Sequence, residues 1–398
     1  MSKRRAAGEG TLVYDQRRGL WVGRVPRGIN RARPAVYGKT QAEARDKLRR
    51  TVRDAERGLI VLSENSRLDD YLEQWLEVVR SRVQRGDLAA TTAAGYERVV
   101  RLHLGPKLGH IALRKLTPGQ VEAMMGELQV EGRKPATVRH VRTTLSGALK
   151  DAQRDELVSR NVARLVGPPH LEKRPPSAFT TDEFRRITAT CELDRLGPLF
   201  MFAAYTGLRR SEVLGLRWSD IDLDGATFQV REGIHQITSV AARATGQTGL
   251  VSSRPKTEAS GSRLPLSGPA VELLRLHHRA QAAERLACLQ PWPDEPEEMH
   301  VFASLVGTAL HPSNVSRAWR RVLERADVAH RTPDRRARGM HELRRTFATR
   351  LRDRGVPLED VQRLGRWASS KMLLEVYSAS DDGRLRRAAE AVSAAMSE

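Results

Sequence analysis

Residues 203–218, AAYTGLRRSEVLGLRW, decide how the second half of the chain folds. The Thr-Gly pair at 206–207 predicts a break between two helices, so that Arg209 projects from the start of the second helix. Glu212, three residues further on, is placed to hold Arg209 through a salt bridge. Arg210 is the competing choice for the projecting arginine. The apolar residues of this stretch are expected in the core: Leu208, Val213, Leu214 and Leu216.

Three further motifs follow at wide intervals. Lys256 lies in SSRPKTEASGSRLPLS, His341 and Arg344 lie in HELRR, and Tyr377 lies in LGRWASSKMLLEVYS. Together with Arg209 they supply two guanidinium groups, an ammonium, an imidazole and a phenol. Such groups can clamp a phosphate, attack it covalently and protonate the leaving oxygen, so neither a metal nor another cofactor is expected. A zinc-protease interpretation of HELRR fails, because an arginine stands where the second histidine of HExxH is required.

In order, spacing and flanking residues, these motifs resemble the tyrosine recombinases, also called the phage integrase family. The resemblance extends over essentially the whole chain. It implies a multidomain, mainly α fold with small β elements. Its parts are an arm-type DNA-binding domain at 1–62, a helical, SAM-like core-binding domain at 63–166, a linker at 167–178 and an α+β catalytic domain at 179–398.

The resemblance makes Tyr377 the nucleophile, which would form a 3′-phosphotyrosine. A phenol with a pKa of about 10 is mostly protonated at neutral pH, so it needs nearby cations and a base to attack phosphorus. Lys256 would protonate the departing 5′ oxygen. The chain has 10 lysines against 58 arginines, and lysine suits a proton donor because arginine keeps its proton near neutral pH. Strands at 251–254 and 263–266, joined by a polar turn, are expected to present Lys256.

The remaining roles are also implied by the resemblance. Arg209 and Arg344 would bind the phosphate, and His341, on the same helical face as Arg344, would hydrogen-bond it and shuttle the tyrosine proton. Ten residues before the tyrosine stands Trp367, where the family commonly has histidine or tryptophan. Its indole N–H can donate one hydrogen bond but cannot take up or release a proton near neutral pH. Arg366 is the competing assignment, and a purely packing role for the tryptophan is the other alternative.

Composition agrees with a nucleic-acid partner. The net charge of +20 over 398 residues indicates a polyanion, with nucleic acid the commonest choice and a membrane surface the alternative. Residues 1–62 contain 16 Lys plus Arg against 6 Asp plus Glu, so phosphate contact is expected to begin there. No apolar run approaches a membrane span and no secretory signal precedes the first domain, so a protein of the bacterial cytoplasm, associated with the nucleoid, is expected. Cys191 and Cys288 are expected as reduced thiols.

Local patterns predict the elements. Segments TLVYD, LWVGRVPR and RARPAVY predict a three-stranded antiparallel sheet, followed by a helix capped by Thr40 and Glu43 that ends near residue 57. A helix from about residue 66 should bury Leu68, Tyr71, Leu72, Trp75, Leu76 and Val79. A second helix should begin at residue 91 or 92 and end before GPKLGH.

Two further helices are expected in the core-binding domain. Thr117, Pro118 and Gln120 supply the cap of a third helix, and 137–151 forms a fourth. A proline-rich linker precedes a helix capped by Thr180 with Glu183. The stretch 237–253 is expected as an extended hairpin arm or a flexible loop. An amphipathic helix at 381–396 could cover its own domain or dock on a neighbouring protomer.

The expected function is that of a site-specific integrase, which would integrate or excise a mobile element by cutting and rejoining DNA. The expected partner is double-stranded DNA at attachment sites, bound by a homotetramer. A DNA-bending or excision factor is a candidate further partner, and no membrane is expected. The excess of arginine and alanine points to an actinobacterial phage or integrative element. A type IB topoisomerase and a catalytically silent DNA-binding regulator are the alternatives; two accessory DNA-binding modules favour recombination.

Overall fold

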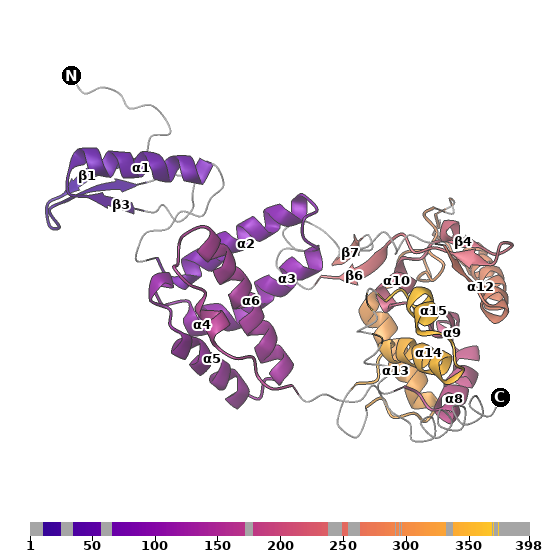
Figure 1. Ribbon diagram of the computed structural model, residues 1–398. Helices are drawn as coiled ribbons and strands as arrows, with labels where there is room; N and C mark the ends of the chain where they lie inside the picture. Colours follow the sequence, from indigo (N-terminus) through magenta and orange to yellow (C-terminus); the bar gives the residue numbers. More distant parts are fainter. Residues whose placement is uncertain are drawn as a thin grey trace, which may run out of the picture. The chain divides into compact units, whose positions relative to one another are not determined.

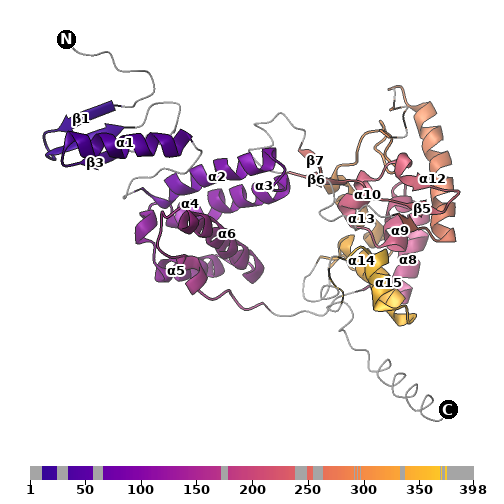
Figure 2. The same cartoon turned by 45° about the horizontal axis from the view of Figure 1, so that its top comes forward.

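The structure is a computed structural model whose chain forms two compact units that separate near residue 172. Helices dominate both units, and the sheets are small (Figures 1 and 2). This confirms the predicted multidomain, mainly helical fold class. The described residues are 11–24, 35–56, 66–171, 178–237, 249–253, 263–290, 292–293, 295, 297–331, 337–367, 369 and 373. Among the helices they form, none is long and apolar enough to cross a membrane.

A small sheet covered by one helix begins the first unit. Its elements are β1 (Thr11–Asp15), β2 (Leu20–Arg24), β3 (Ala35–Gly38) and α1 (Gln41–Glu56). The strands pair antiparallel in the order β1-β2-β3, with Val13 opposite Val22, and α1 lies along the sheet (Figure 1). Gly38 allows this close approach, because a Cβ there would lie 2.5 Å from the Ala44 nitrogen. The predicted sheet and helix are confirmed.

A helical bundle makes up the rest of this unit. Its elements are α2 (Leu68–Gln84), α3 (Ala90–Val99), a π-helical turn (Val100–Leu104), α4 (Gly105–Leu108), a 3-10 turn (Leu113–Lys115), α5 (Pro118–Val130), α6 (Pro135–Arg154) and α7 (Val162–Leu165). All six residues predicted on the inner face of α2 are buried. The Tyr71 hydroxyl donates to the Ala148 carbonyl at 2.6 Å, and the Trp75 indole donates to Asp151 at 2.9 Å. These bonds hold α2 against α6.

The predicted end of the second helix before GPKLGH is wrong. The helix continues from α3 through the π-helical turn into α4, which ends at Leu108. The Gly105 N–H donates to the Val100 carbonyl, a bond that spans five residues. Pro106 then lies in the first turn of α4, directly after the widened turn. A widened turn therefore lets the chain pass a Gly-Pro pair without leaving the helix.

The second unit surrounds α9, which contacts α8, α10, α12 and α14 (Figure 2). Its helices are α8 (Thr181–Glu192), α9 (Gly197–Thr206), α10 (Arg210–Gly215), a 3-10 turn (Trp218–Asp220), α12 (Gly268–Ala287), α13 (Pro312–Arg325), α14 (His341–Asp353) and α15 (Leu358–Leu364). Its strands are β4 (Ile221–Asp222), β5 (Thr227–Phe228), β6 (Gly233–Gln236), β7 (Leu250–Ser253) and β8 (Leu264–Pro265). They form two antiparallel sheets, β4-β5-β8 and β6-β7.

The strand pair predicted to carry Lys256 is corrected by this topology. The segments 251–254 and 263–266 were expected to pair with each other, but β7 pairs with β6 and β8 pairs with β5. Ser253 lies opposite Gly233, and Leu264 lies opposite Phe228. Each strand thus finds a partner upstream in the chain, which the short apolar runs alone could not specify. Most of the stretch expected as a hairpin arm or a flexible loop, residues 238–248, lies outside the described residues.

Helix caps follow the sequence closely. The Thr117 hydroxyl accepts from the Gln120 N–H at 3.3 Å at the start of α5. The Thr180 hydroxyl accepts from the Glu183 N–H at 3.2 Å at the start of α8. In both cases the side chain at the third helical position returns a hydrogen bond to the cap residue. These two capping boxes are confirmed, and Thr40 and Glu43 cap α1 as predicted.

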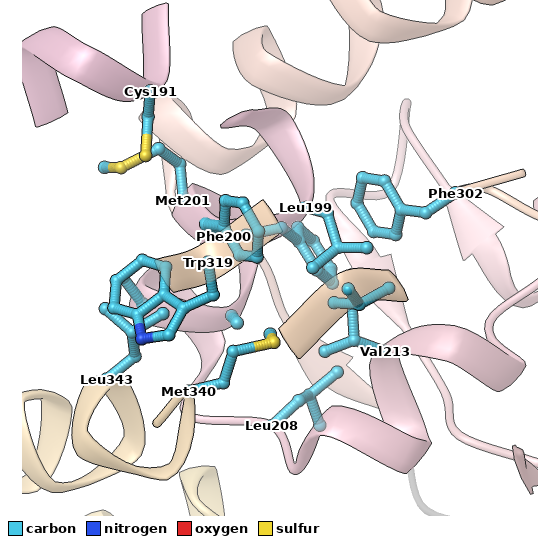
Figure 3. Packing of buried hydrophobic residues seen from close by; sticks show 14 of the residues in the cluster. Cys191, Leu199, Phe200, Met201, Leu208, Val213, Phe302, Trp319, Met340 and Leu343 are labelled. Carbon is cyan, nitrogen blue, oxygen red and sulfur yellow. The ribbon is translucent and has the colours of Figure 1, made fainter. Parts of the chain in front are cut away.

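The core of the second unit is aromatic at its centre. Trp319 packs against Phe200 and Phe179, with ring centroids 5.0 and 5.9 Å apart, and its indole donates to the Arg338 carbonyl at 3.0 Å. Figure 3 shows this tryptophan among residues of several elements. Leu208 and Val213, from the α9–α10 corner, belong to the same core as two residues at the start of α14, Met340 and Leu343. Two segments far apart in sequence are therefore fixed together.

Candidate active site

Arg209 occupies the corner between α9 and α10. Gly207 forms the corner with a φ of 64°, and a Cβ there would lie 2.6 Å from the Phe347 ring, so glycine is required on both counts. Arg209 is the first residue outside α10, and its Nη1 donates to Glu212 Oε1 at 2.9 Å. Its backbone N–H donates to the other carboxylate oxygen at 2.8 Å. Glu212 therefore holds both ends of Arg209, whose side chain stays 40% exposed.

Arg210 faces another way. Its Nη1 donates to the Ser316 hydroxyl on α13 at 2.6 Å. The two adjacent arginines thus have different partners, and Arg209 is the one paired with Glu212. The four apolar residues of this stretch that were predicted to be core are all buried.

Arg344 lies on the buried side of α14, with 2% of its surface exposed. Its Nη1 donates to the Gly207 carbonyl, two residues from Arg209. Its guanidinium carbon stands 3.9 Å from the centre of the Trp367 ring, a cation–π contact. Its Nη2 is buried and has no hydrogen-bond partner among the described residues. The site thus holds a buried cation with one donor that protein atoms do not satisfy there.

The electrostatics of Arg344 follow from this burial. Desolvation, the charge of Arg209 and, to a smaller extent, the charge of Arg366 lower the pKa of the Arg344 guanidinium to about 9, while Glu212 acts in the opposite direction. An anion that accepts a hydrogen bond from Nη2 would stabilise the charged form of Arg344 in these surroundings. The geometry therefore suits a bound oxyanion.

His341 is the first residue of α14, one turn before Arg344. It is exposed, whereas its neighbours Met340 and Leu343 are anchored in the core (Figure 3). Arg345, next to Arg344, donates to Glu342 of its own helix at 3.0 Å. One face of the first turn is thus fixed by packing while His341 remains accessible.

Trp367 and Arg366 lie in the turn that follows α15. Trp367 is 8% exposed and presents its ring to Arg344. Gly365 makes room for that ring, because a Cβ at this position would lie 1.5 Å from it. Arg366 adopts a left-handed φ of 55°, and its Nη1 forms an ion pair with Glu212 Oε1 at 3.6 Å. The two competing choices from the sequence therefore both contact the site, through different partners.

Lys256, Tyr377 and the predicted helix at 381–396 lie outside the described residues. The structure brings together Arg209, Glu212, Arg344, Arg366 and Trp367. Sequence analysis missed the Gly207 carbonyl as the acceptor for Arg344 and the pairing of Arg366 with Glu212. No local sequence pattern predicts either contact, because both join segments more than 130 residues apart.

Arg338 is a further residue that sequence analysis missed. It leads into α14 and makes a bidentate pair with Glu183 of α8, at 2.6 and 2.9 Å. The Glu183 cap was recognised from its spacing to Thr180, but its partner 155 residues away was not. This pair fixes the entry to α14 just before His341.

Comparisons with known proteins give the family. Residues 177–384 match the phage integrase family, and residues 67–128 match the N-terminal SAM-like domain of phage integrases. An integrase of Streptomyces ambofaciens is 30% identical over 387 residues, covering 95% of this chain and 94% of that protein. A XerC-like tyrosine recombinase of Caldanaerobacter subterraneus subsp. tengcongensis is 26% identical over 354 residues, covering 87% and 88%.

Solved structures show the same fold. The integrase of transposon Tn1549, in complex with a circular intermediate DNA, superposes with a TM-score of 0.66 at 17% identity, covering 82% of this chain and 99% of that one. A lambda integrase tetramer bound to a Holliday junction gives a TM-score of 0.57 at 20% identity, covering 94% and 96%.

The chain therefore belongs to the phage integrase family, the tyrosine recombinases. It is a DNA strand-transferring enzyme, a site-specific recombinase of the integrase type.

Proposed function

We propose that this recombinase cuts DNA through Tyr377, with Arg209 and Arg344 holding the scissile phosphate. The tyrosine oxygen attacks phosphorus, and the bond from phosphorus to the 5′ oxygen breaks. The phenol proton passes to His341, and Lys256 protonates the departing 5′ oxygen. The products are a 3′-phosphotyrosine and a free 5′ hydroxyl. Attack by a 5′ hydroxyl of another strand reverses these steps and rejoins the DNA.

The observation that carries this proposal is the buried Arg344 beside the half-exposed Arg209. Arg209 and Arg366 both pair with one carboxylate, Glu212, which also acts electrostatically on Arg344, so these four side chains leave the site with excess positive charge. Arg344 also offers a buried donor without a partner among the described residues. A phosphate entering beside Arg209 would satisfy that donor, and it would gain charge-assisted hydrogen bonds in a largely desolvated place. Phosphoryl transfer depends chiefly on such placed positive charge.

Trp367 supports phosphate binding by Arg344 rather than the proton transfers. Its ring covers the Arg344 guanidinium, which leaves the remaining edge of that group to the phosphate. Because an indole cannot accept or release a proton near neutral pH, His341 and Lys256 are the general base and the general acid in this proposal. The assignments of Lys256 and Tyr377 rest on their sequence motifs.

The accessory domains extend the contact with DNA. We assign residues 63–166 as a core-binding domain, 1–62 as an arm-type DNA-binding domain, 167–178 as the linker and 179–398 as the catalytic domain. The match to a SAM-like integrase domain and the charge of residues 1–62 support this division. The partner is double-stranded DNA at attachment sites, held by an oligomer. The tetrameric assembly of the lambda integrase on a Holliday junction supports a homotetramer here, and an excision factor would set the direction of the reaction.

A nicked suicide duplex tests the proposed chemistry. Such a duplex carries the attachment sequence, mapped from the ends of the integrated element, and loses the short strand after cleavage, so that a covalent protein–DNA complex accumulates. The wild-type protein should form this complex, and Tyr377→Phe should form none, because phenylalanine lacks the attacking oxygen. Denaturing gel electrophoresis measures the trapped fraction.

Neighbouring arginines provide a matched control for that assay. Arg209→Ala should slow trapping by about 10²- to 10³-fold, the usual cost of removing one donor to a transition-state oxyanion. Arg210→Ala should trap near the wild-type rate, because Arg210 is bonded to Ser316 instead. Full trapping by Tyr377→Phe would refute the proposed nucleophile. A protein that traps no DNA would instead be a silent regulator, and one that relaxes supercoils without a partner site would be a topoisomerase.

A further inference from the structure

The Arg366 side chain is not explained by the reaction steps above. It stands in a turn, at a φ of 55° that residues other than glycine rarely adopt. Its side chain is 4% exposed, although arginine is seldom fully buried without a partner. The left-handed φ closes α15 in the same way as Glu156 closes α6 and Asp327 closes α13, so the buried charge is the feature of Arg366 that needs an explanation.

Glu212 forms an ion pair with this side chain. Glu212 Oε1 lies 3.6 Å from Arg366 Nη1 and 2.9 Å from Arg209 Nη1, so one oxygen stands between two guanidinium groups. The other oxygen of Glu212 accepts the backbone N–H of Arg209. Glu212 is itself mostly buried, with 11% of its side chain exposed. Its position is therefore set from both sides, by Arg209 and by Arg366.

The exposed fractions of the Arg209 and Arg366 side chains indicate which of the two can meet a DNA phosphate. A DNA phosphate arrives from solvent, and the Arg209 side chain is 40% exposed whereas that of Arg366 is 4% exposed. The phosphate therefore reaches Arg209, while Arg366 stays behind Glu212. Burial, with the charge of Arg209 adding to it and Glu212 opposing it, lowers the pKa of Arg366, which fits a cation held inside the protein.

We propose that Arg366 is a positioning residue that fixes Glu212 and, through it, the guanidinium of Arg209 for the scissile phosphate. Without Arg366, the Glu212 carboxylate is free to follow Arg209, and the pair can turn away from the phosphate. With Arg366 in place, the carboxylate is shared, so Arg209 keeps its orientation and more of its charge for the substrate. This inference rests on the proposed role of Arg209.

The same turn also contacts Arg344, the other arginine proposed to bind the phosphate. Trp367 stacks on Arg344, and its neighbour Arg366 pairs with Glu212. Two consecutive residues thus hold the two arginines from one side. In the sequence, this turn lies ten residues before Tyr377.

Arg366→Gly is the decisive substitution. Glycine accepts a φ of 55° without strain, which offsets part of the packing and of the ion pair that are lost with the side chain, so the variant should still fold, with a somewhat lower melting temperature. Its trapping rate at saturating protein should nevertheless fall by about 10- to 100-fold, the usual cost of losing a residue that orients a functional group. Its dissociation constant for the suicide duplex should change little, since Arg366 does not reach the phosphate. Arg363→Ala, an exposed change in the last turn of α15, is the matched control and should leave both values unchanged.

A double-mutant cycle with Glu212→Gln separates the two ways in which Arg366 could act. If Arg366 works through Glu212, the Glu212→Gln and Arg366→Gly double variant should be no slower than the slower single variant. Multiplied losses would mean that Arg366 touches the phosphate itself and would overturn the proposal. A wild-type trapping rate in Arg366→Gly would overturn it as well. Trapping by the wild-type protein and by Tyr377→Phe in the same assay keeps the two claims apart. If the wild type traps no DNA, or if Tyr377→Phe traps it fully, the proposed chemistry fails; if only the Arg366 result differs from expectation, the positioning role fails.

Discussion

At the scale of single residues, the proposal that the site binds a phosphate depends most on Arg344. Burying a guanidinium costs free energy unless it is paired, and here one donor is left without a partner among the described residues. The Trp367 ring and the Gly207 carbonyl stabilise the charge from two sides. A bound phosphate would complete its surroundings.

The stacking of Trp367 on Arg344 gives a residue-scale prediction. Gly365→Ala places a methyl group 1.5 Å from the Trp367 ring, so the ring must move away from Arg344. The φ of Gly365 is −82°, which alanine adopts freely, so the effect is steric. We expect a loss of about 1–3 kcal/mol in unfolding free energy, as for other overpacked sites, and slower trapping. Denaturant unfolding and the suicide duplex measure the two effects.

Gly147→Ala is the control for that substitution. Gly147 lies inside α6, and a Cβ there meets no other atom within 4 Å. Alanine should therefore leave stability unchanged or raise it by about 0.5–1 kcal/mol. Equal behaviour of the two alanine variants would show that the Trp367 ring is not confined by Gly365.

Sequence predicts single residues well where the signal is local. The Thr206–Gly207 break, the projecting Arg209 and its pairing with Glu212 all follow from neighbours within a few positions, and the structure has them so. Contacts between distant segments have no such local signal in the sequence. The sequence offered Trp367 and Arg366 as rivals for one place, whereas the structure gives each its own contact, because the left-handed turn points them at different partners.

At the scale of elements, helix ends position the site. Arg209 directly precedes α10, α14 begins at His341, and the turn after α15 carries Trp367. Caps were predictable because they depend on residues three positions apart. The π-helical turn and the strand partners were not, since the former depends on how the helix accommodates Pro106 and the latter on pairing between runs of two to four residues.

The pair of Glu183 with Arg338 gives a prediction at this scale. The Arg338 hydrogen bonds lower the pKa of Glu183 to about 2, against an ordinary value of 4.5. Because the folded pKa is the lower one, the pair stabilises the fold fully above about pH 5 and loses its effect as pH falls toward 2. Glu183→Gln keeps a capping side chain but removes the charge. It should lower stability at pH 7 by roughly 3 kcal/mol, with the difference from wild type shrinking below pH 4.5.

Denaturant midpoints of both proteins from pH 7 to pH 3 measure that difference. Asp182→Asn is the control, because Asp182 lies in the same helical turn but pairs with Arg185 and Arg186 at the surface. Its effect should be small at every pH. A constant gap between Glu183→Gln and the wild type across the range would contradict the assigned ion pair.

At the scale of the whole molecule, charge is distributed unevenly. Residues 1–62 carry 16 of the 68 basic residues and only 6 of the 48 acidic ones. Each phosphate contact steepens the dependence of DNA affinity on salt by about 0.9 in the logarithmic slope. On a duplex long enough to include arm sites, a protein that lacks residues 1–62 should therefore show a shallower slope than the full chain. Titrations at several salt concentrations measure it, and equal slopes would remove the arm-binding assignment.

The central claim, that a tyrosine in the C-terminal segment attacks a phosphate held by Arg209 and Arg344, is tested most directly by locating the bond itself. Covalent complexes trapped on the suicide duplex are digested with nuclease and protease, and mass spectrometry identifies the residue that carries the remaining nucleotide. The account predicts a 3′-linked nucleotide on Tyr377, and its disappearance in Arg344→Ala at short times. A nucleotide on a serine or on another tyrosine would contradict it.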